Sequence, residues 1–289
     1  MRCEILVTDG IRKNVAKISQ DDRDRLRDAF IELGQRKYPD GSSYWHKQDA
    51  IHQATDAHEG ISFLPWHREL CNRLEALLRE VDPGVSLHYW DWTTDPRASD
   101  NGTGGTTNLF TDDFMGNGNG DVSAPFESLG RPTISRKVAF GAPPPSQPPA
   151  QSDEDIIAAG NTAPIEDQYQ LFHDNLQNLP NHNRTHEYIG GNIGFGHTAF
   201  EDPFVFLLHS NVDRLWASWQ LIAGEEWRLD PDKVYGKEGT NDRILRNLEP
   251  WAGGSNMRPW AHPDNQQEVK TSKDPSVVKP PLYDTNPST

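Results

Sequence analysis

Two histidines, His182 and His186, lie four residues apart in the segment NHNRTHEYIGG. On an α-helix, residues i and i+4 lie on the same face, so both imidazole rings would point toward a common position. A helix can hold a metal ion in this way, but a solvated polar face that carries two histidines by chance has the same spacing. The pair alone therefore indicates a candidate metal site without establishing one.

Two further histidines lie on apolar helical stripes. His67 belongs to LPWHRELCNRLEALLREV (64–81), and His209 belongs to PFVFLLHSNVDRLWASWQLI (203–222). A lone histidine on such a stripe is usually a core residue with satisfied hydrogen bonds. Burial of several imidazole rings on facing helices would cost free energy for each ring unless a common bound group satisfied their nitrogen atoms together. We therefore expect these histidines to converge on a metal centre within a helical core.

Three more histidines lie upstream of the first stripe. The segment YWHKQDAIH supplies His46 and His52, and TDAHEGISF supplies His58. Both segments look less regular than the helical stripes. We expect them to close the site from the side.

The available donor groups predict which metal would bind. Cys3 and Cys71 are the only cysteines, too few for a thiolate site. The stripes carry no Glu-x-x-His pair of the di-iron kind, and a catalytic zinc site usually needs only three protein ligands and a water. Imidazole ligands suit copper, which the Irving–Williams order also favours. Two groups of three histidines therefore predict a pair of copper ions.

Helical periodicity places these histidines on a mainly α scaffold. A capping box at Ser19 precedes an apolar stripe that runs to Gly34. Residues 95–121 and 141–155 are rich in Gly, Asn, Pro and Asp, which predicts irregular surface loops. We expect a four-helix bundle core that holds a dinuclear copper site, with long irregular loops and little strand. Beyond the two stripes above, helical patterns cover residues 165–178 and 182–189.

The loops separate two helical halves of the chain. They are not interpreted as a domain boundary, because the histidine-bearing helix face of either half would have no partner if that half folded alone. We expect a single catalytic domain over residues 1–289, with a core at about 11–260. The chain becomes polar and Pro-rich from about residue 250. Residues of about 261–289 are therefore expected to wrap the surface as an extended tail.

Composition excludes several classes of partner. The formal net charge of -15 would repel nucleic acids and anionic lipids, and no basic cluster offsets it. No apolar run approaches the roughly 18 residues that a membrane span needs, and we expect no conventional secretory signal peptide at the N-terminus. We expect a soluble protein with no nucleic-acid or membrane partner, either cytoplasmic or exported with a partner protein.

Several stretches together resemble the tyrosinases, which are type 3 copper proteins, and most of all their compact bacterial members. FLPWHREL, HYWDWTTD and EDPFVFLLHSNVDRLW carry most of the resemblance. IRKNV, HNRTHEYIGG and MRPW (257–260) follow the same family order. The resemblance implies a mainly helical domain that binds two copper ions and uses O2 as co-substrate.

The resemblance also implies how the histidines group. The ligands of copper A would be His46, His58 and His67, and those of copper B would be His182, His186 and His209. His52 lies only six residues from His46, so either could be the first copper A ligand. Cys71, beside the stripe of His67, is interpreted as a buried packing residue.

The activity that the resemblance implies is oxidation of o-diphenols to o-quinones, preceded in monophenol substrates by hydroxylation ortho to the existing hydroxyl group. The substrate would be a small phenol or catechol. A separate copper-delivery or export partner is compatible with the sequence. Alternatives are an o-aminophenol oxidase, a catechol oxidase without monophenolase activity, and a haemocyanin-like oxygen carrier.

Residues next to the copper B ligands are candidates for handling the substrate. Asn183 matches a family asparagine that helps to hold a water thought to deprotonate phenols. The usual partner of that water is a glutamate about nine residues before the first copper B histidine, where this chain has His173, followed by Asp174. A neutral histidine could accept a proton but would not anchor the water as a carboxylate does.

A second group of candidates would contact the substrate. Glu187 at a pocket rim would favour cationic phenols, but an ordinary solvated helix residue is an equally good interpretation of it. Gly196 and His197 are expected on a loop near copper B. Asp213 and Arg214 are interpreted as an ion pair or as support for the ligands rather than as reacting groups.

Overall fold

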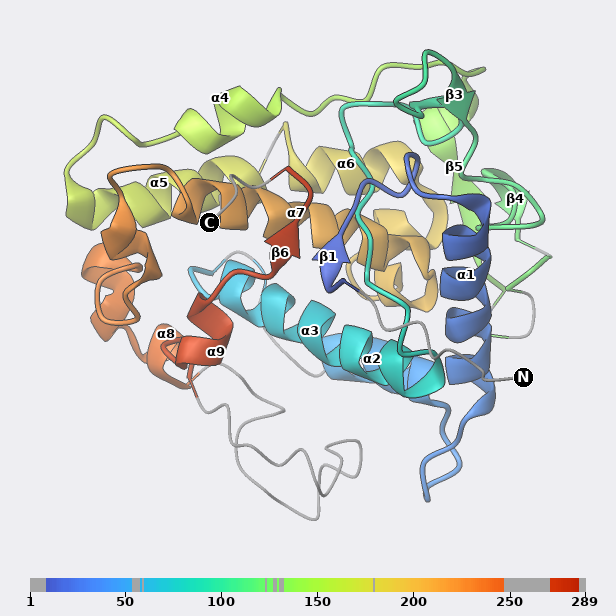
Figure 1. The fold of residues 1–289 in the computed structure, drawn as a ribbon, viewed down its shortest axis with the longest axis horizontal. Helices are drawn as coiled ribbons and strands as arrows, with labels where there is room; N and C mark the ends of the chain where they lie inside the picture. Colours follow the sequence, from blue (N-terminus) through green and yellow to red (C-terminus); the bar gives the residue numbers. More distant parts are fainter. Residues whose placement is uncertain are drawn as a thin grey trace.

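The computed structural model describes residues 9–53, 58, 60–122, 124–126, 129, 133–178, 180–246 and 271–285. The helices dominate this part of the chain, as the sequence predicts (Figure 1). Their bounds are α1 Gln20–Gln35, α2 Tyr44–Gln53, α3 Phe63–Val81, α4 Asp153–Ala158, α5 Ile165–Gln177, α6 His182–Ile189, α7 Phe204–Gln220, α8 Asp242–Arg246 and α9 Pro275–Val278. Short 3-10 turns are η1 Val138–Gly141, η2 Gly191–Gly194, η3 Ala199–Glu201, η4 Glu226–Leu229 and η5 Gly236–Thr240.

The strands are few and short. They are β1 Ile11–Arg12, β2 Ser99–Asp100, β3 Thr106–Thr107, β4 Asn119–Asp121, β5 Ser135–Lys137 and β6 Leu282–Tyr283. The pairs β2–β3 and β4–β5 are antiparallel, and both lie between α3 and α4 in the chain. In contrast, β1 pairs in parallel with β6, so segments 271 residues apart meet in one ladder (Figure 1).

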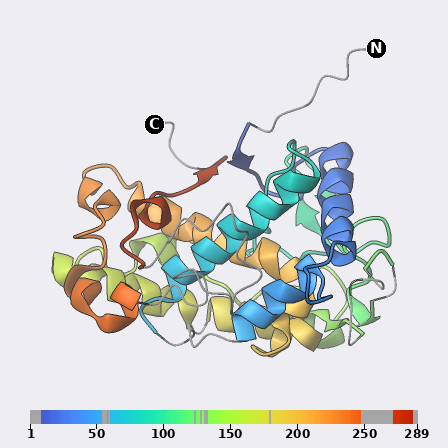
Figure 2. The same cartoon turned by 90° about the horizontal axis from the view of Figure 1, so that it is seen from below.

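Helix α1 forms where the sequence predicts. The side chain of Ser19 accepts a hydrogen bond from the backbone N–H of Asp22, which caps the first turn. The buried face consists of Leu26, Ala29, Phe30 and Leu33. This face packs against α2 and α3, which places α1 beside the histidine-bearing helices (Figures 1 and 2).

Helices α3 and α7 pack against each other and form the centre of the core. Most of α7 is buried, and this includes polar residues such as Asp213 and Arg214, which form ion pairs with Arg12 and Asp153. Helix α3 is amphipathic and buries its Leu70 and Leu74 stripe. Cys71 is buried and reduced, as the sequence predicts. Nowhere in the described ranges does a helix have the length and apolar character needed to cross a bilayer.

The C-terminal segment corrects one prediction. Val277, Val278 and Tyr283 are buried, and Arg68 donates hydrogen bonds to the carbonyl oxygens of Val277 (3.2 Å) and Val278 (3.1 Å). The expectation of an extended surface tail is wrong for residues 275–283, because these few apolar side chains complete the core beneath a polar, Pro-rich composition. The MRPW stretch lies outside the described residues.

A buried cluster of charges joins these distant segments. Arg12 donates to Asp213 (2.9 Å) and to Glu75 (3.0 Å), and Arg68 donates to the other oxygen of Asp213. The hydroxyl of Tyr283 lies 2.9 Å from Asp213 Oδ2. Asp213 therefore ties α7 to α3, β1 and β6 at once.

His88 carries a testable consequence of burial. Its Nδ1 accepts a hydrogen bond from the backbone N–H of Lys13 at 3.0 Å, and burial lowers the pKa of His88 to about 4. An unfolded histidine has a pKa of about 6.5, so the unfolded chain takes up this proton first as the pH falls. Stability is therefore lost between about pH 6.5 and pH 4, by roughly 3 kcal/mol at most from this group.

His88→Asn should reduce that acid sensitivity, because an amide oxygen can accept the same hydrogen bond and does not titrate. The measurement is the urea-unfolding free energy of the copper-free protein and its variant at pH 7.5, 6 and 5. The variant is expected to lose less stability than the parent across this range. Parallel pH dependences for the two proteins would contradict the assignment.

Candidate metal centre

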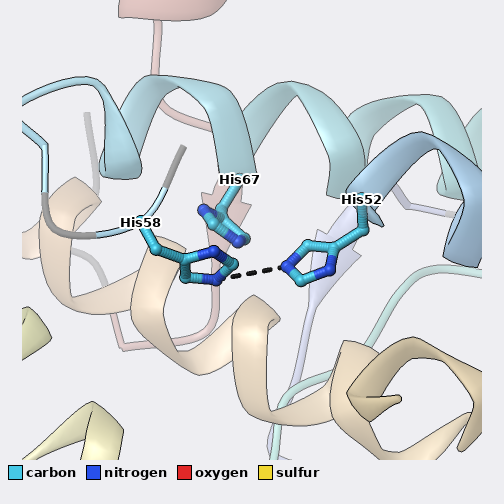
Figure 3. A group of neighbouring side chains, drawn as sticks. All are labelled: His52, His58 and His67. Atoms are coloured by element: carbon cyan, nitrogen blue, oxygen red, sulfur yellow. Dashed lines mark hydrogen bonds between the residues drawn. The ribbon is translucent and has the colours of Figure 1, made fainter. Parts of the chain in front are cut away.

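One group of three histidines forms between α2 and α3. His52 comes from α2, His67 from the start of α3, and His58 from the connection between them (Figure 3). One nitrogen of each ring lies within 4.8 Å of the others, and the Nε2 atoms of His52 and His58 are 3.2 Å apart. His67 Nδ1 donates to the carbonyl oxygen of Phe63 at 2.8 Å. His67 Nε2 is buried and has no hydrogen-bond partner among the described residues.

His46 does not join this group, and the predicted grouping is corrected accordingly. His52, the alternative that the sequence left open, lies there instead. Both residues belong to α2, but six residues correspond to about 240° of helical rotation, so they face different sides. His52 is 4% exposed, whereas His46 is only partly buried. That His52 binds a metal stays a prediction.

Helix α2 was not predicted from the sequence, in which its segment looks less regular than the helical stripes. The buried residues Trp45, Gln48 and His52 recur at helical spacing. This spacing of three to four residues is typical of a buried helix face and could have indicated α2. The pattern was weak because polar residues lie on the same face.

The second group of three histidines forms between α6 and α7. The Nε2 atoms of His182 and His186 lie 3.4 Å and 3.2 Å from Nε2 of His209. His182 Nδ1 donates to the side-chain oxygen of Asn183 at 2.9 Å, and His186 Nδ1 donates to the carbonyl oxygen of Ile193 at 2.7 Å. These bonds place the ring protons on Nδ1 and leave the converging Nε2 lone pairs free.

The two groups face each other across the α3–α7 contact. The rings of His67 and His209 stack with centroids 4.4 Å apart. Phe63 packs beside both groups, with ring centroids 4.4 Å from His67 and 4.8 Å from His182. The arrangement can hold two metal ions side by side.

Burial keeps these imidazoles neutral. It lowers the pKa of His186 to about 4. Burial, reinforced by the neighbouring imidazoles, also lowers the pKa well below the ordinary value for His52, His67, His182 and His209. A neutral imidazole with a free Nε2 lone pair is the form that coordinates a metal. Six imidazole donors without a carboxylate or thiolate fit copper.

The candidate proton-handling residues lie on α5 and α6. His173 is buried, and its Nδ1 lies 2.9 Å from the carboxylate of Asp174. Its Nε2 is buried without a hydrogen-bond partner in the described part of the chain. The ring centroid lies 6.1 Å from that of Phe63, which packs against His67 and His182. Asn183 is partly exposed and is held by His182.

The candidate substrate-contacting residues lie further out. Glu187 is exposed and pairs with Arg184 on the same face of α6. Gly196 and His197 are exposed on residues 191–198, which we call the rim loop. Gln53, which follows His52, donates to the carbonyl oxygen of His197 at 2.7 Å.

Two contributors to the site were not predicted from the sequence. Phe63 lies four residues before His67, and this i,i+4 spacing on an apolar stripe could have indicated it. Phe200 stacks on His52 with centroids 4.0 Å apart. It lies 148 residues away in the chain, so the sequence offered no local signal.

Comparison with known proteins identifies relatives of the chain. Residues 37–222 match a family model described as the common central domain of tyrosinase. The chain is 31% identical over 271 residues to a tyrosinase of Streptomyces glaucescens, an alignment that covers 83% of this chain and 92% of that protein. It is 33% identical over 221 residues to a tyrosinase-like protein of Caenorhabditis elegans, covering 73% of this chain but only 31% of that protein.

Solved structures show the same fold. A tyrosinase from Burkholderia thailandensis aligns with a TM-score of 0.62 at 18% identity, covering 96% of this chain and 74% of that one. A deoxygenated hemocyanin from Rapana thomasiana aligns with a TM-score of 0.61 at 21% identity, covering 96% of this chain and 70% of that one. The fold therefore accommodates both kinds of protein.

Proposed function

The chain belongs to the tyrosinase family of type 3 copper enzymes, and we propose from this premise that it oxidises o-diphenols to o-quinones with O2 and hydroxylates monophenols less readily. The observation that carries the proposal is the pair of facing histidine groups, in each of which one nitrogen of every ring lies within 4.8 Å of the others. We further propose that residues 1–289 act as a single catalytic domain.

We propose His52, His58 and His67 as the ligands of one copper ion and His182, His186 and His209 as those of the other. When bound, the copper pair supplies the transfer of electrons from the phenolic substrate to dioxygen. Each diphenol gives up two electrons and two protons, and one O2 accepts those of two diphenols to become two waters. The chain must therefore position the phenol and accept its proton.

His173 is our candidate for accepting that proton. Asp174 holds the Nδ1–H of His173, so the lone pair of Nε2 is free to take a proton from a phenol directly or through a water. The side-chain oxygen of Asn183 already accepts from His182, which leaves its amide N–H groups to orient that water. A neutral imidazole anchors a water less firmly than a carboxylate, which favours diphenol over monophenol turnover.

The rim residues would set a modest charge preference. Glu187 would attract cationic phenols, but Arg184 offsets much of its charge. Gly196 and His197 would border the substrate from the rim loop. A catechol oxidase without monophenolase activity is the second candidate, and His173 in place of a carboxylate favours it.

The test is copper loading followed by metal analysis and four substrates: catechol, L-DOPA, L-tyrosine and o-aminophenol. We expect two copper ions per chain, rapid quinone formation from the two diphenols and slower turnover of L-tyrosine. Removal of copper by a chelator should abolish activity, and copper but not zinc should restore it. Reversible O2 binding with every phenol left unoxidised would instead indicate a carrier, and faster turnover of o-aminophenol would indicate an aminophenol oxidase.

A further inference from the structure

The rim loop is attached to both histidine groups. The carbonyl oxygen of Ile193 accepts from the ring of His186, in the α6–α7 group. The carbonyl oxygen of His197 accepts from Gln53, the residue after His52 in the other group. The loop therefore bridges the two halves of the metal centre on its outer side.

The loop is also held internally and against its neighbours. The hydroxyl of Thr198 donates to the carbonyl oxygen of Asn192 at 2.8 Å, which closes the loop on itself. The side chain of Asn192 accepts from the backbone N–H of Ser135 at 2.8 Å and donates to Glu201 at 2.5 Å. These bonds fix the path of the backbone on both sides of its tip.

Phe195 is the tip of this fixed loop and is 71% exposed. It lies two residues from each anchoring carbonyl, so its Cα is at most about 7.6 Å from the Cα atoms of Ile193 and His197. A large apolar ring on a mobile loop can turn inward, but this backbone holds Phe195 outside the core. An aromatic ring is thus presented to solvent next to a centre whose substrates are aromatic.

We propose that Phe195 contacts the part of the substrate that remains outside the metal centre and selects o-diphenols that carry a second aromatic ring. This inference rests on the proposed function. The reacting ring must reach the buried histidines, so only a second ring, attached away from the hydroxyl groups, can meet an exposed side chain at the rim. Offset-stacked or edge-to-face contact between the two rings would add affinity that a single-ring catechol cannot obtain.

The test compares catechol with 4-phenylcatechol in the copper-loaded protein and its variants. Phe195→Ala should raise KM for 4-phenylcatechol by about two- to tenfold, with kcat unchanged and KM for catechol unchanged. Phe195→Tyr keeps the ring and should behave like the parent. Phe140→Ala is the matched control, because Phe140 is 70% exposed and lies on η1 rather than on the rim loop.

Binding without turnover separates this inference from the proposed function. Zinc-loaded protein is redox-inert, and calorimetry with 4-phenylcatechol should show the same loss of affinity in Phe195→Ala even if the copper form oxidised no diphenol. An equal effect of Phe195→Ala on catechol and 4-phenylcatechol, or an equal effect of Phe140→Ala, would overturn the role of Phe195. Unchanged affinity in Phe195→Ala would do so as well.

Discussion

Replacing His52 by alanine is expected to remove one of two copper ions per chain and to lower o-diphenol oxidation by about 10³-fold or more. One copper would then keep only two of its imidazoles, and the electrons of the substrate could no longer be passed to O2 by a pair of metals. Metal analysis and the initial rate of quinone formation measure the two effects in the same sample.

His46→Ala is the control for this experiment, because it tests whether loss of any imidazole from α2 has the same effect. Both histidines lie on α2, both substitutions remove an imidazole, and only His52 lies among the Nε2 atoms of the metal centre. His46→Ala should retain two copper ions and a rate within about threefold of the parent, since partly exposed surface substitutions have small effects. The opposite outcome, with His46 essential and His52 dispensable, would refute the grouping.

Asp213→Ala is expected to destabilise the protein by about 3–5 kcal/mol, because it leaves the buried guanidinium groups of Arg12 and Arg68 without their shared carboxylate. All three side chains are at most 1% exposed, so water cannot replace the lost partner. Urea unfolding followed by tryptophan fluorescence, with the copper-free protein, measures the change.

Asp9→Ala provides the comparison for an exposed ion pair. Asp9 and Lys13 interact at 2.7 Å with both side chains more than 40% exposed. Removal of such a pair typically costs about 1 kcal/mol or less. Similar unfolding free energies for Asp213→Ala and Asp9→Ala would show that the buried cluster contributes no more than an exposed pair.

Local sequence signals predicted the helices that have strong caps or stripes. Ser19 and the four apolar residues after it identified α1, and α3 and α7 followed from long apolar periods. The convergence of His67, His182, His186 and His209 followed from the cost of burying imidazoles separately. The sequence could not decide between His46 and His52, because that choice depends on which face of α2 packs against the core.

Contacts between segments that are distant in the chain could not be predicted from caps or apolar periodicity. Asp213 and Arg214 are neighbours in the chain and suggested an ion pair, yet Asp213 binds Arg12 and Arg68 while Arg214 binds Asp153. Successive helical residues point about 100° apart, so adjacency works against pairing. The burial of Val277 and Tyr283 likewise depends on partners more than 200 residues away.

The parallel pairing of β1 with β6 bears on when the protein can finish folding. The contact of Arg12 with the Tyr283 hydroxyl spans 271 residues and cannot form until Tyr283 has been synthesised. Contacts between residues far apart in the sequence are typical of slowly folding proteins. Because the same cluster joins α3 to α7, which carry His67 and His209, these contacts between the two helices and β6 cannot be complete before residue 283 has been synthesised.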